Sequence, residues 1–157
     1  MKRKNSKVKF PMKVNVIAEL RSCISGKIIE RSVAHNTVVS TGKYNVGDYL
    51  GNLETGIAGF PYIAIGESES ADSVVVGDTA LVSEVARELA TIARSGNEVT
   101  FEKTFSFGIG ESYAIEEAGL FDSATETGSV MFNRALFTTK NVGADTELYI
   151  KITISVG

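Results

Sequence analysis

The sequence predicts a mainly β chain, an antiparallel β-sandwich or jelly-roll-like single domain with one or two short helices. Three observations predict it. Apolar and polar side chains alternate in several segments, which is the period of a strand with one buried face. Glycine-containing turn signals separate these segments. The strand–helix–strand rhythm of a parallel sheet is missing, so the strands are expected to join through hairpins.

The first strand is predicted over residues 12–20, where "MKVNVIAEL" places an apolar side chain at every second position. Ser25 and Gly26 form the next turn signal, and Ile28 opens a second strand. Residues 12–39 therefore predict a hairpin and its continuation.

A short helix is predicted next, in "STGKYNVGDYLGNL". Ser40 or Thr41 can cap its first turn, and the helix would carry Tyr44, Tyr49 and Leu50. The three glycines of this stretch weaken the prediction, because each glycine inside a helix costs about 1 kcal/mol relative to alanine.

A buried strand is predicted at residues 60–67, "FPYIAIGE", because its centre is continuously apolar. After a loop of small polar residues, Asp78 can cap a second short helix that ends near Arg87. Leu81 and Val85 would lie one turn apart on the same face of that helix.

The clearest predicted hairpin turns at residues 95–97, "SGN". Lys103 interrupts the apolar face of its second strand and could reach solvent near a sheet edge. Residues 116–137 and 146–156 supply three further strands, for a total of roughly eight. Both faces of the strand at 130–137 are largely apolar, which predicts that it is covered on both sides, by the core and by a neighbouring subunit.

The composition fits one domain with a basic extension. The chain has 157 residues, of which 43% are hydrophobic, enough for one sizeable core. We expect residues 1–10 to form a flexible basic N-terminal arm and residues 11–157 to form the single β-sandwich domain. The net charge of -3 does not indicate nucleic-acid binding, and no apolar run is long enough to cross a membrane. The single cysteine excludes an internal disulfide framework.

Catalytic groups are scarce, so we expect no enzyme activity, no metal and no cofactor. His35 and Cys23 show no metal-ligand spacing, and we expect the former to be a hydrogen-bonded structural histidine and the latter a small packing residue. "GIGES" at 108–112 lacks the remaining residues of a nucleotide-binding loop and has the wrong order for a nucleophile elbow. Glu116 and Glu117 are neighbours on a predicted strand, so they should point to opposite faces and cannot both flank one scissile bond.

The order of several segments carries a resemblance. These segments are "HNTVVSTGKYNVGDYL", "YIAIGESES", "GDTALVSEVAR", "EEAGLFDSATETGSVMFNRALF" and "ELYIKITISV". In this order they resemble a family of small tailed-bacteriophage virion proteins, over about His35 to the C-terminus. The family includes proteins associated with tail fibres, necks and baseplates.

The resemblance implies a structural virion protein, made in the host cytoplasm, that mediates assembly or attachment at the tail, neck or baseplate. Its partners would be other virion proteins, and it would be a homo-oligomer, a trimer or a ring. No nucleic acid or membrane partner is expected. The resemblance also implies structural roles near a turn and as polar locks for Gly119, Leu120, Phe121, Arg134, Arg87 and Glu84.

Partner contacts are expected on the basic arm, on the loop at 67–76 and on the hairpin bend at 123–129, since loops carry recognition. The residues expected to make these contacts are Lys2, Arg3, Lys4, Lys7, Lys9, Glu69, Asp72, Thr125 and Glu126.

Two alternative functions stay open. One is a capsid decoration protein that binds the shell as a trimer through its basic arm. The other is a carbohydrate-binding receptor module, in which a sugar ring would stack on an exposed aromatic side chain. The chain has no tryptophan, so its stacking side chains would be Tyr44, Tyr49, Tyr62, Tyr113 and Tyr149.

Overall fold

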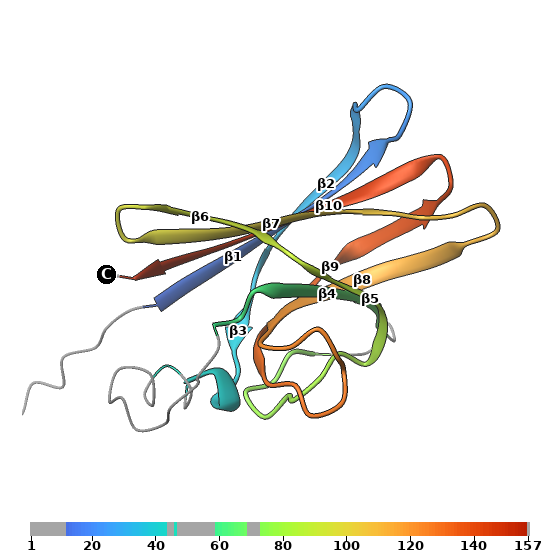
Figure 1. The fold of residues 1–157 in the computed structure, drawn as a ribbon. Coiled ribbons are helices and arrows are strands. Elements are labelled where there is room, and N and C mark those ends of the chain that lie inside the picture. Colours follow the sequence, from blue (N-terminus) through green and yellow to red (C-terminus); the bar gives the residue numbers. More distant parts are fainter. Residues whose placement is uncertain (1–11, 44–45, 47–58, 69–72, 157) are drawn as a thin grey trace, which may run out of the picture.

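The computed structural model describes residues 12–43, 46, 59–68 and 73–156. These residues form ten strands in two antiparallel sheets that pack face to face (Figure 1), which confirms the predicted mainly β class. The strands are β1 (Met12–Ser22), β2 (Ile28–His35), β3 (Thr37–Val38), β4 (Tyr62–Glu67), β5 (Ser83–Leu89), β6 (Thr91–Ser95), β7 (Glu98–Ser106), β8 (Ser112–Phe121), β9 (Met131–Gly143) and β10 (Thr146–Val156).

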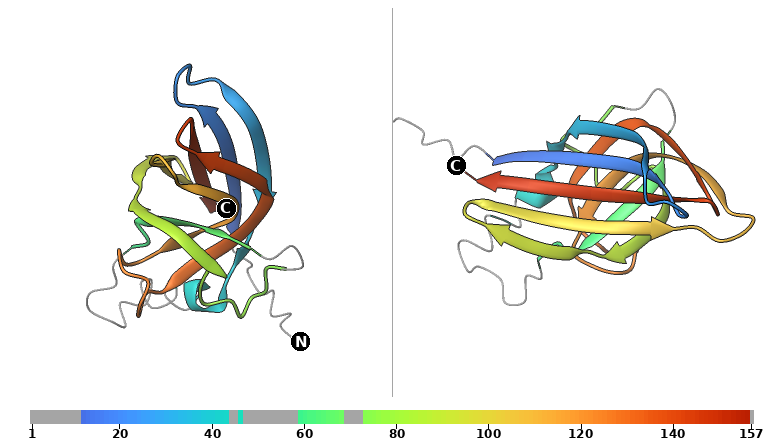
Figure 2. Two further views of the ribbon diagram at one scale, coloured as in Figure 1. Left: turned by 90° about the vertical axis from the view of Figure 1, so that its right-hand side faces the viewer. Right: turned by 90° about the horizontal axis from the view of Figure 1, so that it is seen from above.

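The first sheet, sheet A, has the order β2-β1-β10-β7-β6. These strands lie side by side in the right-hand view of Figure 2. Met12 pairs with Val156 at one end of β1, and Ser22 pairs with Thr146 at the other. The predicted alternation holds, because Val14, Val16 and other even-numbered side chains of β1 face the core.

The second sheet, sheet B, has the order β3-β9-β8-β4-β5. The described chain changes sheet four times, and the crossings after β7 and after β9 join interior strands. At the sheet edges, the chain passes from sheet A to sheet B at Asn36, between β2 and β3, and returns at Ala90, between β5 and β6. Ala90 donates its N–H to the carbonyl of Pro61 at 2.8 Å, which fixes this second crossing. Each of these two edge crossings joins an edge strand of one sheet to an edge strand of the other.

The core lies between the sheets and is built from the inner faces of both. Its largest fully buried apolar side chains include Phe105, Ile150 and Ile152 from sheet A and Ile65 and Leu120 from sheet B. Each such side chain contributes about 1.5–3 kcal/mol when it leaves water. Burial of this kind is the main source of the fold's stability.

Two lysines tie one sheet to the other. Lys140 of β9 is buried and donates to the Ser32 hydroxyl at 2.7 Å, and its Nζ lies 3.4 Å from Glu30, both on β2. Lys103 of β7 forms an ion pair with Glu88 of β5. The Lys103 side chain is 29% exposed, so it reaches solvent as predicted, and its ion pair also joins the two sheets.

A second, smaller apolar cluster lies on the outer face of sheet B. It contains Val39, Ala64, Leu81, Phe121 and Met131. Leu81 belongs to residues 75–82, which we call the strap. The sequence predicts that a neighbouring subunit covers the outer side of the strand at 130–137. This prediction is corrected at Met131, where Leu81 of the chain's own strap belongs to the covering cluster.

The predicted helix beginning at Asp78 and ending near Arg87 is wrong, because most of this segment is the strap and the edge strand β5. The free edge of β4 takes β5 as its partner, with Ile63 opposite Glu88. Asp78 caps no helix and instead accepts a hydrogen bond from the Val75 N–H at 3.0 Å. Leu81 and Val85 face different parts of the molecule.

The other predicted elements are found, with ten strands instead of eight. The strand predicted after Ile28 is interrupted at Asn36 and so gives β2 and β3, and β5 is the second addition. The predicted helix begins at Ser40, whereas Tyr44, Tyr49 and Leu50 lie outside the described residues. The arm at 1–10 also lies outside them.

Gly119 of β8 is required by close packing. A Cβ at this position would lie 2.5 Å from the Asn133 carbonyl oxygen and 3.5 Å from Cδ2 of Leu81. We expect Gly119→Ala to lower the free energy of unfolding by about 1–3 kcal/mol, because a backbone atom must move. Urea denaturation measures this. Gly59→Ala is the matched control, since no atom lies within 4 Å of its Cβ; equal effects at both sites would contradict the packing argument.

Candidate functional site

The most distinctive buried polar group of the described chain lies under the strap. Glu117 of β8 is 0% exposed and Arg134 of β9 is 3% exposed, although both carry charge. Arg134 Nε donates to Glu117 Oε2 at 2.7 Å. The two strands pair directly here, so the register of β8 and β9 holds both side chains on the outer face of sheet B.

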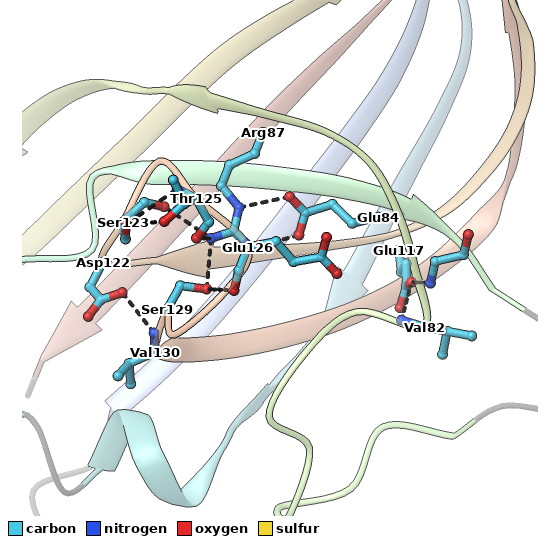
Figure 3. A network of polar contacts seen from close by, with 11 residues as sticks. Val82, Glu84, Arg87, Glu117, Asp122, Ser123, Thr125, Glu126, Ser129 and Val130 are labelled. Carbon is cyan, nitrogen blue, oxygen red and sulfur yellow. Dashed lines mark hydrogen bonds and ion pairs between the residues drawn. The ribbon is translucent and has the colours of Figure 1, made fainter.

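The strap completes this cluster. Arg134 Nη1 donates to Asp78 Oδ2 at 3.0 Å, and Glu117 Oε1 accepts the N–H groups of Val82 at 2.7 Å and Ser83 at 3.3 Å. Figure 3 shows the Glu117 carboxylate facing these amides. We call Glu117, Arg134 and Asp78 the strap lock, because each of the three connects sheet B to the strap.

Glycine makes room for the strap lock. A Cβ on Gly66 of β4 would lie 2.8 Å from Glu117 Oε1 and 2.6 Å from the Ser83 carbonyl oxygen. The glycine of "YIAIGE" therefore allows the carboxylate and the chain after the strap to approach β4.

The charge of Arg134 is stabilised by its partners. Burial lowers the pKa of Arg134, but the hydrogen bonds and charges of Glu117 and Asp78 outweigh burial and raise it. A guanidinium with two carboxylate partners stays charged at all physiological pH values. Arg134 is therefore a permanently charged member of the strap lock.

A second cluster holds the hairpin bend at residues 122–130, which we call the tip. Arg87 of β5 donates through Nη1 to the carbonyls of Ser123 and Thr125, both at 3.0 Å, and to the Ser129 hydroxyl at 2.9 Å. Its other nitrogens donate to Glu84 at 2.8 and 2.6 Å. Figure 3 shows the Arg87 guanidinium at the centre of this network, which we call the tip clamp.

The tip clamp is also packed against the apolar cluster. The guanidinium carbon of Arg87 lies 3.8 Å from the centre of the Phe121 ring. At the base of the tip, Asp122 accepts the Val130 N–H at 2.7 Å. A planar five-donor group suits such a site, because it can satisfy several acceptors at once.

The sequence-predicted site residues fall into three groups. Gly119, Leu120 and Phe121 lie at the end of β8, the latter two fully buried. Arg134 lies in the strap lock, and Arg87 and Glu84 form the tip clamp.

The predicted contact residues are mostly not described. Thr125 and Glu126 lie exposed on the tip. The following lie outside the described residues: Lys2, Arg3, Lys4, Lys7, Lys9, Glu69 and Asp72.

Two members of the strap lock were missed from the sequence. The sequence around Asp78 predicts a helix cap, and the adjacent Glu116 and Glu117 suggest only a pair of catalytic acids. Glu116 and Glu117 in fact have different partners, since Glu116 accepts from the Thr139 hydroxyl while Glu117 pairs with Arg134. The available signal is a carboxylate in a largely apolar strand, because a carboxylate that is buried there needs a cation as its partner.

The structure also bears on the predictions for Cys23 and for metal binding. Cys23 was expected to pack but is exposed on the turn between β1 and β2. Within the described part of the chain, no group of three or more histidine, cysteine, aspartate or glutamate side chains is arranged to hold a metal ion.

One recess of about 500 Å³ lies at the β1 end where Met12 begins the strand. It is lined by Met12, Val14, Asn36, Thr37, Val38, Lys43 and Val46. Lys43 is the only titratable side chain among these described lining residues, so they contain no acid–base pair.

The described tyrosines all have a ring in contact with the protein. Arg21 lies 3.9 Å from the centre of the Tyr149 ring, the Tyr113 ring lies 5.9 Å from that of Phe107, and Tyr62 packs on the outer cluster. A sugar-stacking platform built on Tyr149 would have to displace Arg21. Burial raises the pKa of Tyr149 to about 12, and Glu102 adds to this effect.

Tyr149 should make stability depend on alkaline pH. Because the folded-state pKa is raised, the folded chain favours neutral Tyr149, and this contribution is present below about pH 10 and lost as the pH rises toward 12. We expect Tyr149→Phe to reduce the fall in unfolding free energy over this interval. Urea denaturation of both proteins across the interval measures the difference, and identical pH profiles would contradict the assignment.

Comparison of the chain with protein-family models, curated proteins and solved structures found no match. Among the described residues, no helix has the length and apolar character needed to cross a membrane.

Proposed function

We propose that this chain is a structural virion protein of a tailed bacteriophage, which mediates assembly or attachment at the tail, neck or baseplate through protein–protein contacts. The order of its sequence segments supports this proposal. The use of its buried charges supports it as well, because those charges hold the strap and the tip in place.

The tip clamp is the observation that carries the proposal. A hairpin bend of small polar residues would ordinarily be a mobile part of the surface. Here Arg87 binds two of its carbonyls and one of its hydroxyls, so Thr125 and Glu126 are presented in a fixed shape. A fixed polar loop lowers the entropy cost of binding a partner protein.

Partner binding in this proposal uses surface contacts with other virion proteins, and the protein itself is a homo-oligomer. No enzyme activity is part of it. The two neighbouring glutamates that first suggest a reaction are separated, since Glu117 is enclosed under the strap and Glu116 binds Thr139.

Electron microscopy of purified particles tests the proposal, with gold-labelled antibody against this protein. We expect label at the tail, neck or baseplate. Label spread over the shell would support the alternative of a capsid decoration protein, because a decoration protein repeats across the whole capsid. Absence of label from every particle would contradict both virion roles.

The role of the tip can be tested in the same particles. We expect Glu126→Arg to reduce incorporation, because it reverses the charge of an exposed tip side chain. Glu98→Arg is the matched control, since it reverses an exposed carboxylate on the β6–β7 hairpin. Equal incorporation of both variants would contradict a tip contact.

A further inference from the structure

The end of the molecule opposite Met12 exposes large apolar side chains. Ile24, on the turn between β1 and β2, is 90% exposed, and Ile109, on the connection between β7 and β8, is 99% exposed. Ile28 and Ile29, where β2 begins, are each about half exposed. None of these four isoleucines belongs to either apolar cluster of the protein, and exposed apolar groups of this kind mark interaction surfaces.

These turns form one continuous end of the molecule. The Cys23 N–H donates to the Asp145 carbonyl at 3.1 Å, and Ser112 pairs with Gly143. In sheet A, β10 lies between β1 and β7. The turn that follows β1 and the connection that follows β7 therefore leave the sheet two strand positions apart. Figure 1 shows the three turns together, far from the C-terminus. We call residues 22–27, 107–112 and 143–147 the turn end.

The turn end carries negative charge beside its apolar side chains. Glu111, Asp145 and Glu147 belong to it, and none of the three forms an ion pair within the described part of the chain. Lys27 is the one basic residue in these three ranges. A binding segment should therefore combine apolar groups with positive charge.

The sequence contains such a segment. Five of the 16 basic residues and none of the 19 acidic residues lie in residues 1–11, so residues 12–157 hold 11 basic against 19 acidic side chains. Within the arm, "KVKF" at 7–10 alternates lysine with Val8 and Phe10. An extended segment with this pattern presents cations on one side and apolar groups on the other.

The arm cannot meet the turn end of its own molecule through residues 7–10. Met12 lies at the opposite end of β1, and the ten residue steps from Met12 to Ser22 span about 34 Å. Lys7 lies five residues before Met12, a distance of at most about 18 Å even for a fully extended chain. A contact between the two therefore joins different copies.

We infer that residues 7–10 of one copy bind the turn end of a second copy, so that the chain assembles head to tail. Lysines of the arm pair with the carboxylates of the turn end, and Val8 or Phe10 covers its isoleucines. A contact between two different surfaces is heterologous and produces a ring or an open filament instead of a two-fold dimer. This contact does not depend on the virion role.

Light scattering of the purified full-length protein tests the inference. The parent should show a mass above the 16.8 kDa of one chain, and added salt should lower it, because salt screens exposed charges. Lys7→Glu with Lys9→Glu, and separately Asp145→Lys with Glu147→Lys, should each reduce the assembly to single chains. Combining all four substitutions in one chain should restore assembly, because the charges are then exchanged between the two surfaces.

Two further variants separate the apolar contact from general effects of charge. Ile109→Ser should raise the dissociation constant about tenfold or more, as expected when an apolar side chain loses its buried contact. Glu98→Lys, which reverses an exposed charge where β7 begins, should leave the mass unchanged, and circular dichroism should show that all variants are folded.

Three results would overturn the inference. The first is a parent protein that stays a single chain at every concentration. The second is loss of assembly in the arm variant but not in the turn-end variant, which would show that the arm binds a different surface of the second copy. The third is a fourfold variant that remains a single chain although it is folded.

Discussion

Arg134→Met is expected to lower the free energy of unfolding by about 3–5 kcal/mol, because it leaves buried carboxylates without their cation. Glu117 is fully buried and would keep only the amides of Val82 and Ser83, while Asp78 would lose its bond of 3.0 Å. Methionine preserves much of the apolar volume of the arginine stem, so the loss reports the charge and not a cavity. Urea denaturation gives the free energy.

Two controls identify the strap lock as the cause. Lys151→Met removes an ion pair with Glu102 at 3.0 Å in which both side chains are about one-third exposed, so it should cost under about 1 kcal/mol. Adding Glu117→Gln to Arg134→Met should recover part of the loss, since the buried charge is then removed as well. Arg134→Met costing no more than Lys151→Met would contradict a buried ionic lock.

The parts of the fold that follow from local patterns were predictable. The alternating side chains of β1 and β10 identify strands and their inner faces, and the structure has both. The predicted turns at Gly26 and Gly96 also hold, because both glycines have positive φ, at 66° and 58°. In each case the signal and its cause lie within a few residues of one another.

The strap and β5 could not be predicted in this way. A leucine and a valine one helical turn apart fit either a helix or a segment that packs on two different surfaces, and only the free edge of β4 decides between them. That edge is supplied by residues about twenty positions earlier. Local propensity was overridden here by the pairing requirement of a distant strand.

The candidate site shows the same division. Arg134, Arg87 and Glu84 were named through the family resemblance, but their partners depend on the sheet register. Arg134 and Asp78 are 56 residues apart, and Arg87 and Ser129 are 42 residues apart. A buried charge in an apolar strand can be recognised in a sequence, whereas the identity of its partner cannot.

Arg87→Met is expected to lower the free energy of unfolding by about 3–5 kcal/mol and to loosen the tip. The Arg87 side chain is 4% exposed, so its charge is held almost entirely by Glu84 and by acceptors of the tip. Methionine would keep the contact with the Phe121 ring but release three acceptors of the tip and leave Glu84 unpaired. Urea denaturation measures the global loss.

Hydrogen exchange distinguishes loosening of the tip from a general loss of stability. Relative to the parent, Arg87→Met should accelerate exchange of the Ser129 and Val130 N–H groups, which hydrogen-bond within the tip, more than it accelerates exchange in β10. Arg87→Lys should resemble Arg87→Met, because a lysine ammonium cannot reproduce the geometry of the guanidinium with both Glu84 and the tip. A lysine variant with parental stability and tip protection would show that a single positive charge suffices, and the fixed shape of the tip would then need another cause.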